Sequence, residues 1–116
     1  MTRHDDHTRL RHMLAYAQEA ANLTGDHCRK DLDSDRLLRH AMTHIVGVIG
    51  EAAARVSEPF RQAHADIPWG EIVGLRNRLI HGYDKVDLDI LWRIVQADLP
   101  PLIAELKRIL ESSPGR

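Results

Sequence analysis

Residues 76–83 bring together side chains that can act on a phosphate, in a segment that reads RNRLIHGY. Arg76 is a permanent cation that can bind two phosphate oxygens at once. His81 has the side chain whose proton comes and goes near neutral pH. A cation for phosphate beside a base for a hydroxyl is the minimum equipment for cutting RNA without a metal ion. The segment therefore predicts ribonuclease chemistry with Arg76 and His81 as the catalytic pair and with no metal or cofactor.

The expected reaction is a transesterification within the RNA strand. His81 takes the proton from a ribose 2'-hydroxyl as general base, and the oxygen attacks the adjacent phosphorus. Arg76 stabilises the negative charge that builds on the phosphoryl oxygens. The products carry a 2',3'-cyclic phosphate and a 5'-hydroxyl, and DNA is spared because it lacks the 2'-hydroxyl.

Helical spacing leaves the geometry of this pair open. On a straight helix Arg76 and His81 are about 140° apart, whereas Asn77 and His81 share a face. Asn77 is thus placed to orient His81 or the substrate. Arg76 must reach around, or the helix must bend or end near Gly82, or a second copy of the chain completes the site. A purely structural interpretation pairs Arg76 with Glu51 or Glu71 and makes His81 a helix C-terminal cap.

The segment resembles the R-x4-H signature of the HEPN superfamily and, more narrowly, the R-x4-H-x-Y of its HepT-like branch. The flanking sequences IGEAA at 49–53, IPW at 67–69, and WRIV at 92–95 followed by LP at 99–100 resemble the same branch. The resemblance extends from about residue 8 to residue 110. It implies an all-α antiparallel helical bundle, a homodimer, and an endoribonuclease that acts as the toxin of a toxin–antitoxin pair.

Tyr83 gains a role from this resemblance alone. In the HepT-like branch the matching tyrosine is where a partner nucleotidyltransferase of the MntA type, the antitoxin, attaches AMP. The attached nucleotide would add phosphate charge and bulk beside Arg76 and His81 and would block the cleft. The plainer interpretation is an amphipathic aromatic residue at the surface. The acidic residues at 84–89 would be solvated surface or would contact a magnesium-bearing partner enzyme.

Two other classes of function remain open. The chain could be a non-catalytic module that binds a nucleotide or substrate for a nucleotidyltransferase, with Arg76 and His81 gripping phosphate without cleaving it. It could also be a purely structural helical dimer, in which changes at these two residues affect stability more than activity.

The remaining chemically capable residues give weaker indications. His40 and His44 have a spacing that can hold zinc, with His12 as a conceivable third ligand, but partly exposed helix histidines are the favoured account. Cys28 lies between His27 and Arg29 without an accompanying motif. Core packing is favoured over base stacking for the two tryptophans, Trp69 and Trp92.

Composition limits the setting. The chain has 116 residues, with 16 Lys and Arg, 17 Asp and Glu, and one cysteine. The length predicts one domain, 1–116, with 112–116 as a frayed tail. The absence of a long apolar run or a signal-peptide core, together with the lone cysteine, predicts a cytoplasmic protein with no membrane segment. The net charge of -1 means that any RNA site must be local.

Helical periodicity runs through the whole sequence. We expect helices at about 6–22, at 34–55, at a short segment after the Ser57 cap, from Ile67-Pro68 to Gly82, from Asp84 or Asp87 onward, and after a bend at Pro100-Pro101. The 6–22 helix is expected to bury one apolar stripe: Leu10, Met13, Leu14, Ala17 and Ala21. The 34–55 helix has two such stripes, one of Leu38, Ala41, Ile45, Val48 and Ala52 and a second of Met42, Val46, Ile49, Ala53 and Val56. Two stripes predict burial on more than one side, which fits both a core and a subunit interface. Gly47 and Gly50 on that helix suggest a close approach by another backbone.

Overall fold

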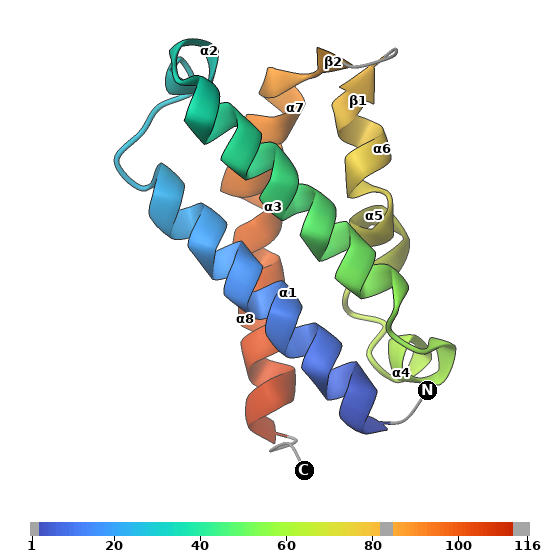
Figure 1. The fold of residues 1–116 in the computed structure, drawn as a ribbon. Coiled ribbons are helices and arrows are strands. Elements are labelled where there is room, and N and C mark those ends of the chain that lie inside the picture. The colour runs from blue at the N-terminus through green and yellow to red at the C-terminus, as the bar shows by residue number, and fades with distance from the viewer. Residues whose placement is uncertain (1–2, 82–84, 113–116) are drawn as a thin grey trace.

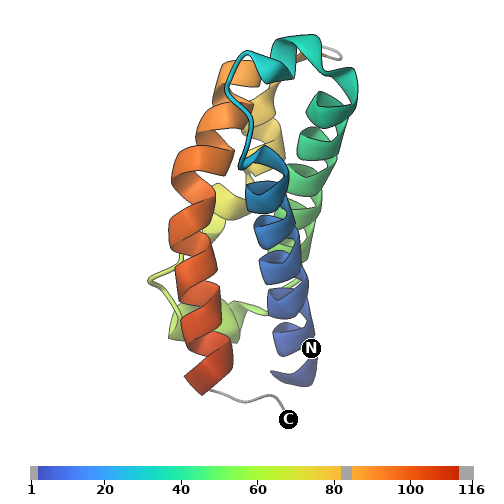
Figure 2. The ribbon, with the colours of Figure 1, turned by 90° about the vertical axis from the view of Figure 1, so that its left-hand side faces the viewer.

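The computed structural model describes residues 3–81 and 85–112, and the fold is all-α, as the sequence predicts. Three long helical stretches form an antiparallel bundle: α1 (Arg3–Thr24), α3 (Arg36–Ala54), and the succession α7 (Leu88–Arg93), η1 (Ile94–Asp98) and α8 (Leu99–Ser112). Helix α1 packs between α3 and α8 (Figure 1). From the side, α7 to α8 form one long column beside α1 (Figure 2).

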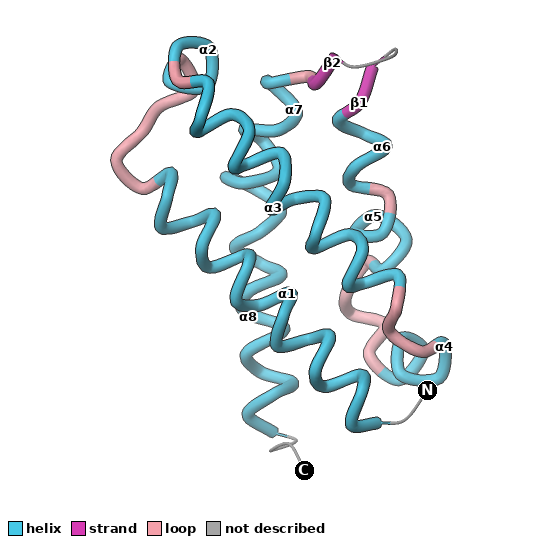
Figure 3. Tube along the Cα trace, in the orientation of Figure 1, coloured by secondary structure: helices cyan, strands magenta, loops and turns pink. Residues whose placement is uncertain are grey.

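Short elements complete the bundle, and most of its length is helix, with loops confined to the connections (Figure 3). They are α2 (Asp31–Ser34), α4 (Glu58–Ala63), α5 (Trp69–Val73), α6 (Leu75–Leu79), and the strands β1 (Ile80–His81) and β2 (Lys85–Val86). The two strands form one antiparallel pair, with Ile80 opposite Val86 and His81 opposite Lys85. Within the described residues, no helix is long and apolar enough to cross a bilayer.

The core lies where the inner faces of α1, α3 and α8 meet. Leu10, Met13 and Ala17 of α1 are fully buried, as predicted, but Ala20 is buried where Ala21 was expected and Ala21 is exposed. The second predicted stripe of α3 is buried throughout: Met42, Val46, Ile49, Ala53 and Val56. In the other predicted stripe Ala41 and Val48 are only half-buried. Helix α3 therefore packs one side into the core, while Ala41 and Val48 on another side remain partly exposed to solvent.

Helix boundaries follow the predicted caps. The Asp35 side chain accepts a hydrogen bond from the Leu38 N–H at 3.0 Å, at the start of α3. Ser57 and Asp87 cap α4 and α7 in the same way. Asp84, the alternative start of α7, lies outside the described residues. At the far end of α3, the Arg61 guanidinium donates to carbonyl oxygens of 53, 54 and 56.

The single helix predicted from Ile67 to Gly82 is wrong. The segment forms α5 and α6, separated at Gly74, and the backbone turns extended at Ile80 with φ -89° and ψ 118°. The Asp87 N–H donates to the Leu79 carbonyl at 2.8 Å, so the hairpin ends the helix by supplying a partner for one of its last carbonyls. This contact is distant in sequence, which is why helical periodicity alone did not reveal it.

The bend expected at Pro100-Pro101 is also wrong. The chain continues from α7 into α8 through the π-turn η1, in which the Leu99 N–H donates to the Ile94 carbonyl. The π-turn absorbs an extra residue within the helical run, so the helix is not interrupted between α7 and α8. Both prolines lie at the start of α8, where a missing N–H is tolerated. Ser112 still belongs to α8, and the rest of the predicted tail lies outside the described residues.

Candidate functional site

Arg76 lies on α6 with an exposed side chain, beside the middle of α3. It lines a shallow hollow of about 360 Å³ together with Thr43, His44, Gly47, Val48 and Glu51. Within residues 3–81 and 85–112, Arg76 has no recorded ion pair or hydrogen bond. Glu51 instead pairs with Arg55 at 3.6 Å. The structural interpretation of Arg76 as an ion-pair partner of Glu51 or Glu71 is therefore not supported, and its guanidinium is available to a ligand.

The two arginines of the motif have different surroundings. Arg78 lies two residues after Arg76, about 200° around the helix, and so faces the other side of α6. There its guanidinium donates to the Asp98 carboxylate at 3.1 Å. Asn77 is exposed, with no hydrogen bond recorded to any described residue. Of the two arginines on α6, Arg76 therefore lies beside α3, whereas Arg78 is paired with Asp98 on the opposite side.

The backbone of His81 belongs to strand β1, so His81 is not on the helix that carries Arg76. Because α6 ends at Leu79, the helical arithmetic that separated Arg76 and His81 by about 140° does not apply. The prediction that Asn77 and His81 share a helix face is wrong for the same reason. Of the three geometries left open by the sequence, the structure contains the ended helix, with its last residue at Leu79, three residues before Gly82. The His81 side chain and Tyr83 lie outside what the structure describes.

Two further hollows adjoin the one beside Arg76. One, of about 450 Å³, is lined by Arg39, His40, Thr43 and His44 of α3, by Val86 of β2 and by Leu88 of α7. The other, of about 300 Å³, is lined by Arg9 and His12 of α1, by Val48, Glu51 and Ala52 of α3, and by Arg55 just after α3. The hollow beside Arg76 shares Thr43 and His44 with the 450 Å³ hollow. It shares Val48 and Glu51 with the 300 Å³ hollow. We call the three together the α3 furrow.

The α3 furrow is basic. Its lining includes four arginines and three histidines against a single carboxylate, Glu51. The Arg39 side chain is held in place by its hydrogen bonds to the carbonyls of Leu32 and Asp33, at 2.9 and 3.1 Å. A row of cations of this kind attracts a polyanion. Sequence reasoning missed Arg9, Arg39 and Arg55, because no motif marks them.

The other predicted candidates are accounted for structurally. His40 and His44 share a hollow, but His12 lines a different one, and the described residues contain no group of three or more potential metal ligands. Trp69 is buried, and its indole N–H donates to the His64 carbonyl at 3.0 Å, which confirms a core role. Cys28 is exposed.

Two of the acidic residues at 84–89 have partners within the fold, and the third, Asp84, lies outside the described residues. Asp89 accepts a 2.6 Å hydrogen bond from Arg29, and Asp87 caps α7. Both carboxylates thus contribute to local structure.

Comparison with known proteins decides the family. The model of the HepT-like ribonucleases matches residues 13–109, which include the whole motif and most of the furrow. The chain belongs to the HepT-like ribonuclease family. Two archaeal relatives carry provisional names as RNases. One, from Methanocaldococcus jannaschii, is 33% identical over 92% of this chain and 98% of its own length. The other, from Thermococcus cleftensis and provisionally named ribonuclease HepT, is 33% identical over 74% of this chain and 78% of its own.

A bacterial relative agrees with these two. It comes from Caldanaerobacter subterraneus, is also provisionally named as an RNase, and is 35% identical over 71% of this chain and 73% of its own length. Solved structures gave no significant match. Membership of the HepT-like family confirms the resemblance seen in R-x4-H-x-Y and the all-α helical fold that it implied. It also establishes that this chain is of a ribonuclease type, whereas the role of each residue within the motif is a separate matter.

Proposed function

We propose that this HepT-like protein is a metal-independent endoribonuclease that acts as the toxin of a toxin–antitoxin pair. His81 removes the proton from a ribose 2'-hydroxyl, the freed oxygen attacks the neighbouring phosphorus, and the bond to the 5'-oxygen of the next nucleotide breaks. Arg76 stabilises the charge that gathers on the phosphoryl oxygens. The products are a 2',3'-cyclic phosphate and a 5'-hydroxyl.

The observation that carries this proposal is that Arg76, in a chain of a ribonuclease family, is exposed and unpaired among the described residues. It lies at the centre of the basic α3 furrow. Arg78 on the same helix is, by contrast, paired with Asp98. The cations on either side extend the attraction along the furrow, so an RNA strand lying in it would place one of its phosphates at Arg76.

A homodimer fits the same surface. Gly47, half-buried at the edge of the furrow, would meet no atom within 4 Å if it carried a β carbon. The chain's own packing therefore does not require a glycine there, although glycine weakens a helix. A second copy crossing near this point would bring the two furrows together as the walls of one cleft, with an Arg76 in each wall.

The proposed regulation acts at Tyr83. A partner nucleotidyltransferase of the MntA type would transfer AMP to the tyrosine oxygen, releasing pyrophosphate from ATP. Tyr83 is two residues from His81, so the new phosphate would lie within reach of the arginine that binds RNA phosphate and would compete for it. The cytoplasm, where RNA and ATP are both present, is the expected location.

Purified chain, prepared without its partner and shown to be unmodified by intact mass, tests the proposed catalysis. We expect it to cut RNA without added metal, leaving the ends named above. Arg76→Ala should slow cleavage about 10²- to 10³-fold and His81→Ala about 10²- to 10⁴-fold. Arg78→Ala is the matched control, because it removes an arginine from the same helix that faces Asp98 instead of the furrow. Equal cleavage by wild type and His81→Ala would refute the assignment.

The Tyr83 proposal needs its own measurement. Intact mass spectrometry of the chain expressed with its nucleotidyltransferase partner should show added AMP that disappears in Tyr83→Phe. The modified protein should cut RNA more slowly than the unmodified one. If a partner shown to be active adds nothing, neutralisation would proceed by complex formation instead.

The alternative is a non-catalytic module that binds a nucleotide for the partner enzyme. The same furrow and Arg76 would then grip phosphate without cleavage. Nucleotide binding that Arg76→Ala abolishes, in a preparation that leaves every RNA intact, would favour this alternative.

A further inference from the structure

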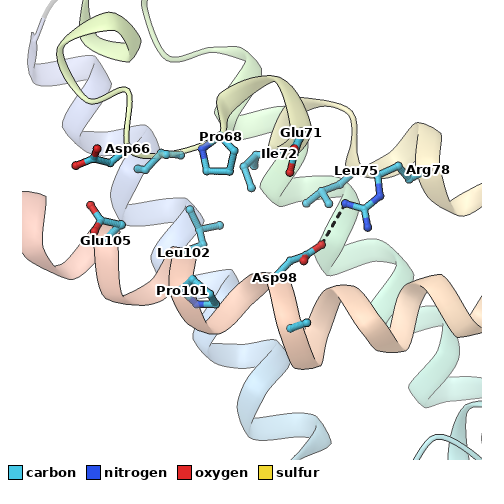
Figure 4. A pocket seen from close by; sticks show the side chains of 12 residues that line it. Asp66, Pro68, Glu71, Ile72, Leu75, Arg78, Asp98, Pro101, Leu102 and Glu105 are labelled. Carbon is cyan, nitrogen blue, oxygen red and sulfur yellow. Dashed lines mark hydrogen bonds and ion pairs between the residues drawn. The ribbon is translucent and has the colours of Figure 1, made fainter.

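A pocket on the other side of α6 has the opposite character to the α3 furrow. It lies between the segment from Asp66 to Leu75 and the wall formed by η1 and α8, and its volume is about 190 Å³ (Figure 4). For comparison, an apolar cavity of about 150 Å³ can enclose benzene. The pocket therefore has room for one large apolar side chain. Arg78 belongs to this pocket, whereas Arg76 belongs to the furrow.

The middle of the pocket is apolar and its two ends are acidic. Ile72, Leu75 and Leu102 are buried beneath it, and Pro68 and Pro101 lie beside them. Figure 4 shows Asp66 and Glu105 at one end, with Glu71, Arg78 and Asp98 at the other. A ligand that fits must place an apolar group between two acidic ends.

The acidic ends are only partly neutralised. At one end Arg108 contacts both Glu105, at 2.7 Å, and Asp66, at 3.8 Å. At the other end Arg78 is paired with Asp98. Glu71 has no recorded ion pair or hydrogen bond with any described residue. Four carboxylates thus face two guanidinium groups, and the potential over the pocket is negative.

The wall of the pocket adds to this negative character. Ala97 and Asp98 reach it from the π-turn η1. Pro100 and Pro101 have no N–H, so they cannot donate the regular helical hydrogen bonds to the carbonyls four residues before them, at Gln96 and Ala97. Single π-turns occur often at functional sites. This surface repels nucleic acid phosphate and attracts cations.

We propose that this pocket is a docking site for a protein partner that inserts an apolar side chain flanked on both sides by lysine or arginine. The apolar side chain would be enclosed by Ile72, Leu75 and Leu102. The flanking cations would contact Glu71 at one end and the Asp66–Glu105 end at the other. This interaction is separate from RNA cleavage, because no residue lining the pocket lines the α3 furrow.

The test is an NMR titration of the full-length, isotope-labelled chain with the capped tripeptide Lys-Phe-Lys. We expect saturable shifts confined to amides of about 66–78 and 97–105. The capped peptides Glu-Phe-Glu and Lys-Gly-Lys are the controls, one with reversed charge and one without the apolar side chain. A similar response to all three peptides, or no saturable response to Lys-Phe-Lys, would overturn the proposal.

Two variants sharpen the result. Glu71→Lys should weaken Lys-Phe-Lys binding by about two- to fivefold, which is the effect of losing one exposed ion pair. Glu111→Lys, which changes an exposed glutamate outside the pocket, should not change the binding. Equal binding by Glu71→Lys and wild type would contradict the assignment. Both variants should cut RNA at the wild-type rate, so a failure of docking is distinguishable from a failure of the catalytic proposal.

Discussion

The two glycines of α3, Gly47 and Gly50, allow a sharp test of the packing. Replacing each by alanine should change the stability of the fold in opposite directions, although the two positions are only three residues apart. At Gly47 a β carbon would meet no atom within 4 Å. At Gly50 it would lie 3.1 Å from the Ile72 carbonyl oxygen and 3.4 Å from that of Val73. Gly50 is thus where α5 comes against α3, which confirms the predicted close approach at this glycine. The chain's own fold contains no such approach at Gly47.

The magnitudes follow from these distances. Replacing an interior helix glycine by alanine stabilises a helix by about 0.5–1 kcal/mol. Gly47→Ala should gain about this amount. Gly50→Ala gains the same propensity but forces two backbones apart, and overpacking of this kind costs about 1–3 kcal/mol. Taking the middle of each range, its net effect should be a loss of about 1 kcal/mol. For a chain of this length, each 1 kcal/mol shifts the melting temperature by about 3–5 °C.

Urea denaturation followed by circular dichroism measures both variants. The expected result is a higher midpoint for Gly47→Ala and a lower one for Gly50→Ala, with unchanged slopes. The measurement should be repeated over a wide range of protein concentration, because association adds to apparent stability. A gain at Gly47 that reverses at high concentration would indicate a partner helix packed there. Gly50→Ala as stable as wild type would refute the packing argument itself.

Two further predictions concern the contact between α4 and α1. His64 stacks on Phe60 with ring centroids 4.4 Å apart, and burial, followed by the positive charge of Arg108, lowers its pKa from the ordinary 6.5. The folded state then binds fewer protons than the unfolded state, so the free energy of unfolding should fall as the pH drops below about 6.5. Urea titrations at pH 7.5 and 5.5 measure this fall. It should be smaller in His64→Gln than in the wild type. Asp6 is buried and accepts hydrogen bonds from the Ser57 N–H at 2.9 Å and hydroxyl at 2.7 Å, so Asp6→Ala should cost about 2–3 kcal/mol in the same titrations, and a cost below 0.5 kcal/mol would contradict this.

The helices were predictable from sequence because their signals are local. Asp35, Ser57 and Asp87 each cap the helix they precede, and a cap depends only on the next three residues. The apolar stripe of α3 likewise depends on spacing alone. The prediction failed where distant contacts decide the structure. The end of α6 depends on a hydrogen bond from Asp87, and the path through Pro100 depends on packing of the long α7–α8 column against α1.

The candidate site divides in the same way. The motif identified Arg76 and His81 by residue type, and the family match supports the ribonuclease chemistry that they suggest. The motif did not distinguish the environments of Arg76 and Arg78, because those depend on Glu51 and Asp98, far away in the sequence. Nor did it reveal the α3 furrow, which gathers residues from α1, α3, α6, β2 and the start of α7. The sequence shows directly which residue types are present, but whether a side chain can reach a ligand depends on contacts that only the fold reveals.

The net charge of -1 is reconciled with an RNA substrate by the way the charges are distributed. Four arginines and three histidines line the α3 furrow with one carboxylate, while four carboxylates line the pocket across α6 with one arginine. At physiological ionic strength a charge is screened beyond about 8 Å, so an RNA phosphate in the furrow responds to the arginines around it more than to the carboxylates on the other side of the helix. A chain with almost no net charge can therefore attract RNA on one surface and repel it on another, which supports the proposal that an RNA strand lies along Arg76.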